Sequence, residues 1–165
     1  ALESLHSVVH AIAPLVKPRP CCWRRAGLCV RPCNPKDLVM RLLLLATVGG
    51  AIGAGARHLV NVGFARLFGT DFPWSTVVIN IVGSLLMGVV VTAVALRFDG
   101  SPELRTFLAT GILGGFTTFS AFSLDAHILM SRGDTTAALL YVAASVLLSI
   151  LGLYVGLLFT RQVLA

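Results

Sequence analysis

The sequence predicts an all-α integral membrane protein with four transmembrane helices in each subunit. Of its 165 residues, 56% are hydrophobic and only 12% are charged. A soluble domain carries about 25% charged residues, because its surface must face water. Here the apolar residues fall into four long segments, each reaching the roughly 20 residues that a helix needs to cross a bilayer. We therefore expect a lipid bilayer to surround most of the chain.

The four expected helices lie at residues 42–67, 74–96, 104–130 and 136–160. Short loops rich in Gly, Pro, Asp and Arg separate them, so consecutive helices must run antiparallel. The spacings Gly49-x-x-x-Gly53 in the first helix and Gly152-x-x-x-Gly156 in the fourth let helix backbones approach closely in lipid. From these spacings we expect tight helix packing and a dimer.

Residues 1–39 read as a separate basic extension. They contain six of the thirteen lysine and arginine residues, all four cysteines and five of the seven prolines, but no apolar run long enough to span a bilayer. We expect this extension to be disordered, or to result from a start assigned upstream of a natural start at Met40. Residues 40–165 then form the transmembrane domain. That domain has no basic stripe, so no nucleic-acid partner is expected.

The arginines at the helix ends show little asymmetry between the two sides of the membrane. One side carries Arg41, Arg97, Arg105 and Arg161, and the other carries Arg66 and Arg132. An excess of positive charge normally fixes the orientation of a membrane protein. With so small a bias the chain can insert both ways, and an antiparallel homodimer is expected.

Polar residues inside the expected helices are costly in lipid and are usually functional. Arg57, in the first helix, either extends to the nearer membrane interface or lines a vestibule that attracts anions. Thr76 and Asn80 are four residues apart and share one face of the second helix. The amide of Asn80 either makes an interhelical hydrogen bond or offers its N–H groups to a passing anion.

The third expected helix contains the largest group of residues that indicate a function. Its glycines and threonines disfavour a continuous helix, so we expect a break near Gly114–Thr118. Broken backbone at membrane depth is tolerated where it is buried or lines a cavity, and its freed carbonyl groups suit a bare cation. Phe119 and Phe122 share a face just beyond the break. Their ring edges can attract a small dehydrated anion; alternatively, both rings pack against lipid or the core.

These residues fall within three motifs that resemble, in the same order, those of the Fluc/CrcB fluoride channel family, over essentially all of residues 40–165. The motifs are Gly49-Gly50-x-x-Gly53 with Gly55-Ala56-Arg57, Phe72-Pro73-Trp74-Ser75-Thr76 through Asn80-x-x-Gly83-Ser84, and Thr110-Gly111-x-x-Gly114-Gly115-Phe116-Thr117-Thr118-Phe119-Ser120-Ala121-Phe122-Ser123. The third motif is the most specific of them.

The resemblance implies a fluoride-specific ion channel that lowers cytoplasmic fluoride by passive export across a bacterial inner membrane, and no enzymatic activity. It also implies a dual-topology, antiparallel homodimer with two pores and one structural Na⁺ at its centre, held by backbone carbonyls of the broken third helices. The residues that the resemblance assigns are the Na⁺ ligands Gly114 and Thr117, the pore residues Asn80, Phe119, Phe122, Ser120 and Thr76, and the vestibule residue Arg57.

Three positions depart from the family pattern. Ala121 stands where the family commonly has threonine, which removes one hydroxyl from the proposed polar track. Asp125 replaces the usual glutamate and keeps its charge, and His58 replaces a common aromatic residue. None of the three touches the carbonyl pair, because backbone ligands do not depend on side chains.

The main alternative is a small multidrug/proton antiporter, which can also be an antiparallel dimer of four-helix subunits. Such a transporter needs an acidic residue in its first helix, where this chain has Arg57. A lipid-modifying membrane enzyme needs clustered carboxylates, or a nucleophile with a base. The five acids after residue 40 are expected, unpaired, at helix ends or in loops. A structural membrane subunit is also compatible, but it would not require Asn80 or a broken helix.

Overall fold

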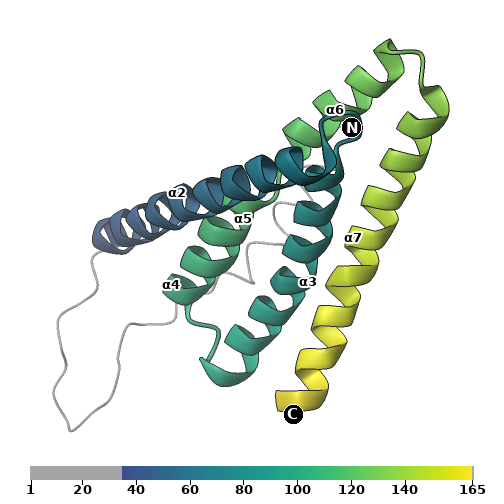
Figure 1. Cartoon of the computed structure of the whole chain (residues 1–165). Coiled ribbons are helices and arrows are strands. Elements are labelled where there is room, and N and C mark those ends of the chain that lie inside the picture. Colours follow the sequence, from purple (N-terminus) through teal and green to yellow (C-terminus); the bar gives the residue numbers. More distant parts are fainter. Residues whose placement is uncertain (1–34, 165) are drawn as a thin grey trace, which may run out of the picture. The chain divides into compact units, whose positions relative to one another are not determined.

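The computed structural model describes residues 35–164, which are helical apart from short connections (Figure 1). The membrane-crossing elements are α2 (Pro35–Phe68), α3 (Trp74–Arg97), a composite third span (Pro102–Ser131) and α7 (Thr135–Leu164). All four are long and apolar enough to cross a membrane. The expected all-α membrane architecture is confirmed.

The first helix begins earlier than the sequence predicts. α2 already includes residues 35–39, which were expected to belong to the N-terminal extension. Residues 1–34 lie outside the described part of the chain, and the expectations of disorder and of a start at Met40 concern that region. These two expectations stay predictions.

The third span is built from four helical pieces. α4 (Pro102–Arg105) leads into a π-helix, η2 (Thr106–Leu113), then α5 (Gly114–Phe116) and finally α6 (Phe119–Ser131). Between α5 and α6 the backbone is extended, with φ −77° and ψ 157° at Thr117 and φ −153° and ψ 124° at Thr118. The expected interruption therefore lies at the C-terminal end of the predicted window. The preceding π-helix was not predicted; such segments are rare and often occur at functional sites.

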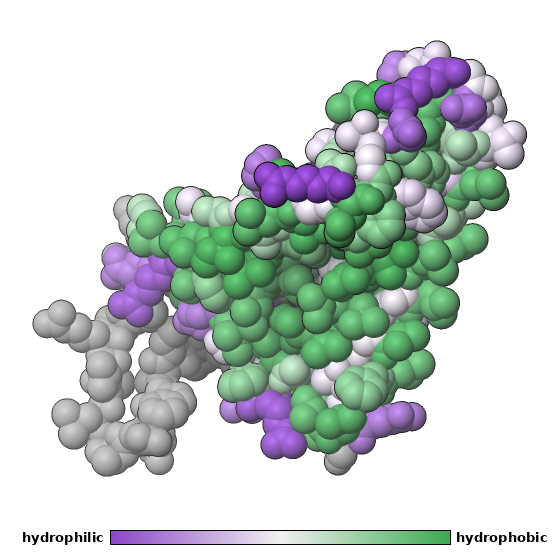
Figure 2. Space-filling view, in the orientation of Figure 1, coloured by the Kyte–Doolittle hydropathy of each residue, from purple (hydrophilic) through white to green (hydrophobic). Residues whose placement is uncertain are grey.

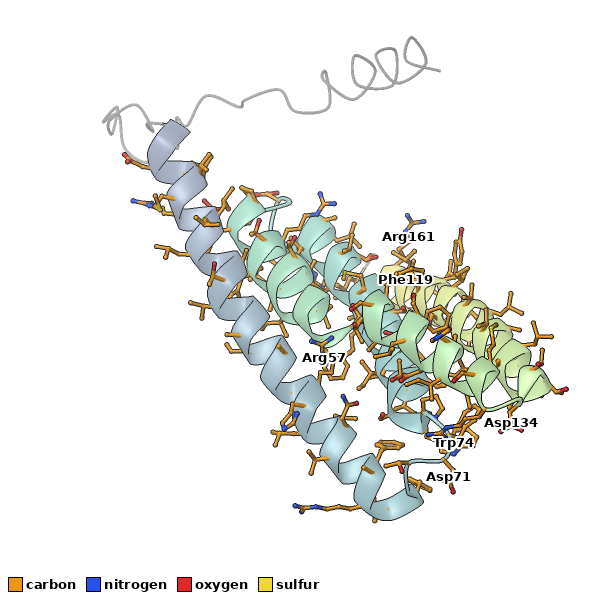
Figure 3. The ribbon with its side chains drawn as sticks, turned by 90° about the horizontal axis from the view of Figure 1, so that it is seen from above. Arg57, Asp71, Trp74, Phe119, Asp134 and Arg161 are labelled. Atoms are coloured by element: carbon orange, nitrogen blue, oxygen red, sulfur yellow. The ribbon has the colours of Figure 1, made fainter. Side chains whose placement is uncertain are left out.

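The hydrophilic surface gathers at the ends of the helices. In Figure 2 it lies over the ends of α3, α6 and α7, and the surface between them is largely hydrophobic apart from one hydrophilic patch over α2. Asp71, Trp74 and Asp134 mark one end in Figure 3. There the Arg132 Nη1 donates to the Asp71 carbonyl at 3.3 Å, which ties the α2–α3 loop to the end of α6. This distribution fits a protein whose middle lies in hydrocarbon and whose ends lie at the interfaces.

α2 crosses the π-helical segment with backbone against backbone. A Cβ atom added to Gly49 would lie 2.7 Å from the Phe107 carbonyl oxygen, and one added to Gly53 would overlap the Ile112 carbonyl oxygen. No other residue type fits this crossing without moving the backbone. The first small-residue spacing is thus used inside the subunit.

An extensive helix contact joins α3 and α7. A Cβ atom on Gly152 would lie 3.2 Å from the Ile81 carbonyl oxygen, and one on Gly156 would overlap the Leu85 carbonyl oxygen. Residue numbers rise together along both helices, so the second and fourth spans are parallel. Because both small-residue pairs pack within one subunit, the spacings do not indicate a dimer. The expected dimer keeps its support from the charge bias and the family resemblance.

Changing Gly156 to alanine is expected to lower the free energy of unfolding by about 1–3 kcal/mol, since the added methyl group meets backbone atoms that cannot rotate away. Chemical denaturation in detergent micelles measures this loss. Gly63→Ala is the matched control, because a Cβ atom there meets nothing within 4 Å. That variant should be neutral or slightly more stable, since alanine favours the helix. Equal destabilisation of both variants would contradict the close packing of α7 on α3.

Candidate functional site

Asn80 of α3 and Thr118 of the third span meet at the helix break. The Thr118 backbone N–H donates to the Asn80 Oδ1 at 3.1 Å, and the Asn80 Nδ2 donates to the Thr118 carbonyl at 3.4 Å. The interhelical hydrogen bond, one of the two readings of Asn80, is thus present. A carboxamide nitrogen carries two hydrogens, so this pairing leaves one donor for another ligand. Both readings are therefore compatible with the geometry.

The Thr118 side chain starts α6. Its Oγ1 accepts the Ala121 backbone N–H at 3.2 Å, which caps the helix. The same hydroxyl lies 3.2 Å from the Ser120 Oγ. The break is therefore an ordered structure, held by Asn80 on its backbone and by its own hydroxyl on α6.

A cavity of about 380 Å³ lies beside the break, between α3, α6 and α7. It is lined by three of the expected pore residues, Asn80, Phe119 and Phe122, together with Ser145 and Ser149 of α7. The two phenylalanine ring centroids are 5.5 Å apart. Phe122 is only 8% exposed, whereas Phe119 is 78% exposed. The rings thus share one cavity, but Phe119 also faces outward from the chain.

A second cavity, of about 490 Å³, lies between α2 and α6. Arg57, His58 and Asn61 line it from α2, and Ser120 lines it from α6. Figure 3 shows Arg57 extending from α2 towards the third span. Thr118 lines both this cavity and the first. The structure therefore places Arg57 and Ser120 on the α2 side of the break, and Asn80 with the two phenylalanines on the α7 side.

Asp125 lies within α6 and is hydrogen-bonded. It accepts the Thr76 hydroxyl at 2.7 Å and the Tyr141 hydroxyl at 3.4 Å, both on Oδ2. The expectation that Asp125 lies at a helix end, as an isolated solvated charge, is wrong. Thr76 and Asp125 line a third cavity, of about 290 Å³, so Thr76 does not share the cavity of Asn80. The expected polar track is divided among three cavities.

At the break, the Gly114 carbonyl lacks the N–H donor that it would have in a continuous α-helix. In an uninterrupted α-helix the N–H of residue 118 would bond to the carbonyl of Gly114. That N–H goes to Asn80 instead, while the Thr117 N–H and hydroxyl both donate to the Leu113 carbonyl, at 3.0 and 2.9 Å. Gly114 is also exposed. The Gly114 carbonyl is therefore suited to a cation, such as the Na⁺ that the family resemblance implies.

Side-chain metal ligands do not gather elsewhere in residues 35–164. Within that range, no three His, Cys, Asp or Glu side chains lie close enough to hold a metal ion.

The family model described as CrcB-like protein, Camphor Resistance (CrcB), matches residues 44–157. The chain belongs to this family. Proteins called Fluoride-specific ion channel FluC from Chelativorans sp. (strain BNC1) and Mesorhizobium japonicum are each 55% identical to it, over 74% and 73% of this chain and 98% and 96% of their own. A third, from Rhodospirillum centenum, is 48% identical over 76% of this chain and the whole of its own. The resemblance drawn from the three motifs is confirmed.

Two residues that line the first cavity were not predicted from the sequence. Ser145 and Ser149 have buried hydroxyl oxygens with no hydrogen-bond partner in the described chain, and both line the cavity of Asn80. The spacing Tyr141-x-x-x-Ser145-x-x-x-Ser149 puts three polar groups on one face of a very apolar helix. Polar groups inside a membrane need hydrogen-bond partners, so this spacing could have indicated that the two serines are functional.

The hydrogen bond from Thr76 to Asp125 is expected to stabilise the packing of α3 against α6. Thr76→Val removes the hydroxyl at nearly constant volume, and a hydrogen bond to a charged group contributes about 1.5–3 kcal/mol. Denaturation in detergent should show a loss of this size in an otherwise unchanged protein. In an Asp125→Ala background the same substitution should have much less effect. An equal loss in both backgrounds would show that the two side chains are not coupled.

Proposed function

We propose that this chain is a fluoride-specific ion channel that lowers cytoplasmic fluoride by passive export across a bacterial inner membrane. The observation that carries the proposal is the first cavity, of about 380 Å³, which lies at a helix break and has Asn80, Phe119, Phe122, Ser145 and Ser149 among its lining residues. The names of the relatives support the same proposal, because each is called a fluoride-specific ion channel. These proteins are about half identical to this chain over about three-quarters of its length.

The groups around this cavity suit a small, strongly hydrated anion. A selective path must replace the hydrogen bonds that water gives to the ion. Asn80 has one N–H free of the break, and the Ser145 and Ser149 hydroxyls have no protein partner in the described chain. The positive edges of Phe119 and Phe122 add a weak attraction without a strong binding charge. Fluoride can therefore be held here without being trapped.

Arg57 and Ser120 serve as the vestibule of this path. A guanidinium in a cavity raises the local concentration of anions before they reach the narrower region. For Thr76 we propose a different role from the one that the resemblance implies. Its hydroxyl donates to Asp125, so it is not a free donor for an anion, and it acts by holding that carboxylate in place.

The active form in this proposal is an antiparallel homodimer with a Na⁺ at its centre. Gly114 is exposed and its carbonyl lacks a helical donor, although it lies in the middle of a membrane-crossing span. Facing lipid, such a carbonyl would cost several kcal/mol. A second copy, with a cation between the Gly114 and Thr117 carbonyls of both subunits, would satisfy these groups. The exposed Phe119, next to the break, would be covered by the same contact.

A bacterial strain that lacks its own fluoride exporter tests this function in cells. Production of the full chain should restore growth in millimolar fluoride, because passive export prevents the ion from accumulating. The membrane fraction should contain the protein, as shown by immunoblotting. Growth no better than that with an empty plasmid, despite protein in the membrane, would contradict the proposal.

A further inference from the structure

The Asn80 amide links the two ions of the proposed channel. Asn80 lines the first cavity, the proposed anion path, together with Phe119 and Phe122. The same carboxamide makes both hydrogen bonds to the Thr118 backbone, at 3.1 and 3.4 Å. The Asn80 side chain thus takes the place of one helical hydrogen-bond acceptor where the third span is interrupted.

The bond to the Asn80 Oδ1 has a direct consequence for Gly114. The Thr118 N–H is the donor that the Gly114 carbonyl would receive in a continuous α-helix. The helical ladder still operates one residue earlier, because the Thr117 N–H donates to the Leu113 carbonyl at 3.0 Å. The series of helical hydrogen bonds therefore stops at Thr118, because its N–H donates to Asn80 and not to Gly114. Without that acceptor, the helical bond and a bound cation would compete for the Gly114 carbonyl.

We propose that Asn80 is a positioning residue for the cation as well as a donor to the anion. Its Oδ1 holds the Thr118 N–H away from Gly114 and so keeps the Gly114 carbonyl available to a monovalent cation. The inference rests on the proposed Na⁺ site of the channel. It adds that cation affinity is set by a side chain on a different helix. Coupling between two binding sites is reciprocal, so cation binding must in turn stabilise the Asn80–Thr118 pair.

Two substitutions separate the two ends of the carboxamide. Asn80→Leu removes both the acceptor and the donor at similar volume. Asn80→Asp loses the donor but keeps an oxygen that can accept the Thr118 N–H. Both variants should lose fluoride flux, whereas only the leucine variant should lose cation affinity. Gln162→Leu is the matched control, because Gln162 carries the same type of side-chain amide, is exposed near the end of α7 and lines none of the three cavities.

The measurement is the thermal stability of the purified full chain as sodium replaces N-methylglucamine at constant ionic strength. A cation that binds only the folded state raises the melting temperature in a concentration-dependent way. The half-saturating sodium concentration should rise about tenfold or more in Asn80→Leu. It should not rise in Asn80→Asp, because the added negative charge favours a cation, and it should stay near the original value in Gln162→Leu. An unchanged midpoint in Asn80→Leu, or no sodium dependence in the unmodified chain, would overturn the inference.

Hydrogen exchange of the unmodified protein provides a second test should the leucine variant fail to fold. The Thr118 amide should exchange more slowly in sodium than in N-methylglucamine, since the cation stabilises its bond to Asn80. Equal exchange rates would contradict the inference. Neither readout needs fluoride, so a protein with the sodium effects but no fluoride flux would disprove only the proposed function. A fluoride channel without them would disprove only this inference.

Discussion

Changing Asn80 to aspartate is expected to abolish fluoride flux while the protein stays folded. A carboxylate at this position lines the same cavity, but it repels the anion and has no N–H to donate. Two unit charges about 4 Å apart repel each other by about 4 kcal/mol at the effective dielectric constant of a partly buried site. That energy corresponds to a loss of about a thousandfold in rate. Flux measured with a fluoride electrode on loaded liposomes should fall to the background of empty liposomes.

The control for Asn80→Asp adds the same charge elsewhere. Thr136 lies in the exposed first turn of α7 and lines none of the three cavities, so Thr136→Asp should keep most of the flux. Size-exclusion chromatography and circular dichroism should give the same profile for both variants. Wild-type flux through the Asn80→Asp protein would remove Asn80 from the ion path.

Removing the hydroxyls of Ser145 and Ser149 together should lower fluoride flux by about 100-fold or more. Both oxygens are buried, lack a partner in the described chain and line the cavity of Asn80. Each hydrogen bond to a charged group contributes about 1.5–3 kcal/mol, so the loss of two that form only as the ion passes gives an effect of this size. Fluoride efflux from liposomes containing the double alanine variant measures it.

Ser123→Ala is the matched control for the serine pair. Its hydroxyl is exposed and already donates to the Phe119 carbonyl at 2.9 Å, so it offers no free donor to the ion. Flux through this variant should stay within about twofold of the original. A double variant that conducts as well as Ser123→Ala would show that the α7 hydroxyls serve packing alone.

The position of the break could be predicted from sequence only to within a few residues. Glycine and threonine content marks the segment where a helix is weakest, and this segment was predicted as Gly114–Thr118. Why α5 ends at Phe116 depends on Asn80, which is 38 residues away from Thr118 in the sequence and accepts the Thr118 N–H. The π-helix before the break likewise cannot be predicted from the local amino-acid composition. α2 crosses this π-helix at Gly49 and Gly53, where the close backbone contact leaves no room for a side chain.

The site was predicted better as a set of residue types than as an arrangement. Asn80, Phe119 and Phe122 do share one cavity, whereas Arg57 and Thr76 each line another. Periodicity within one helix shows which residues share a face, but it does not show which neighbouring helix that face meets. The Thr76–Asp125 hydrogen bond joins two helices, and for that reason sequence spacing could not reveal it.

The most direct test of the proposed channel is fluoride selectivity in a purified system. Liposomes containing the full chain should release fluoride rapidly on addition of a potassium ionophore, and should release chloride no faster than protein-free liposomes. The fluoride rate should scale with the amount of protein reconstituted. If fluoride leaves no faster than chloride, the chain is not a fluoride channel, and Asn80, Phe122 and the α7 serines do not line a fluoride path.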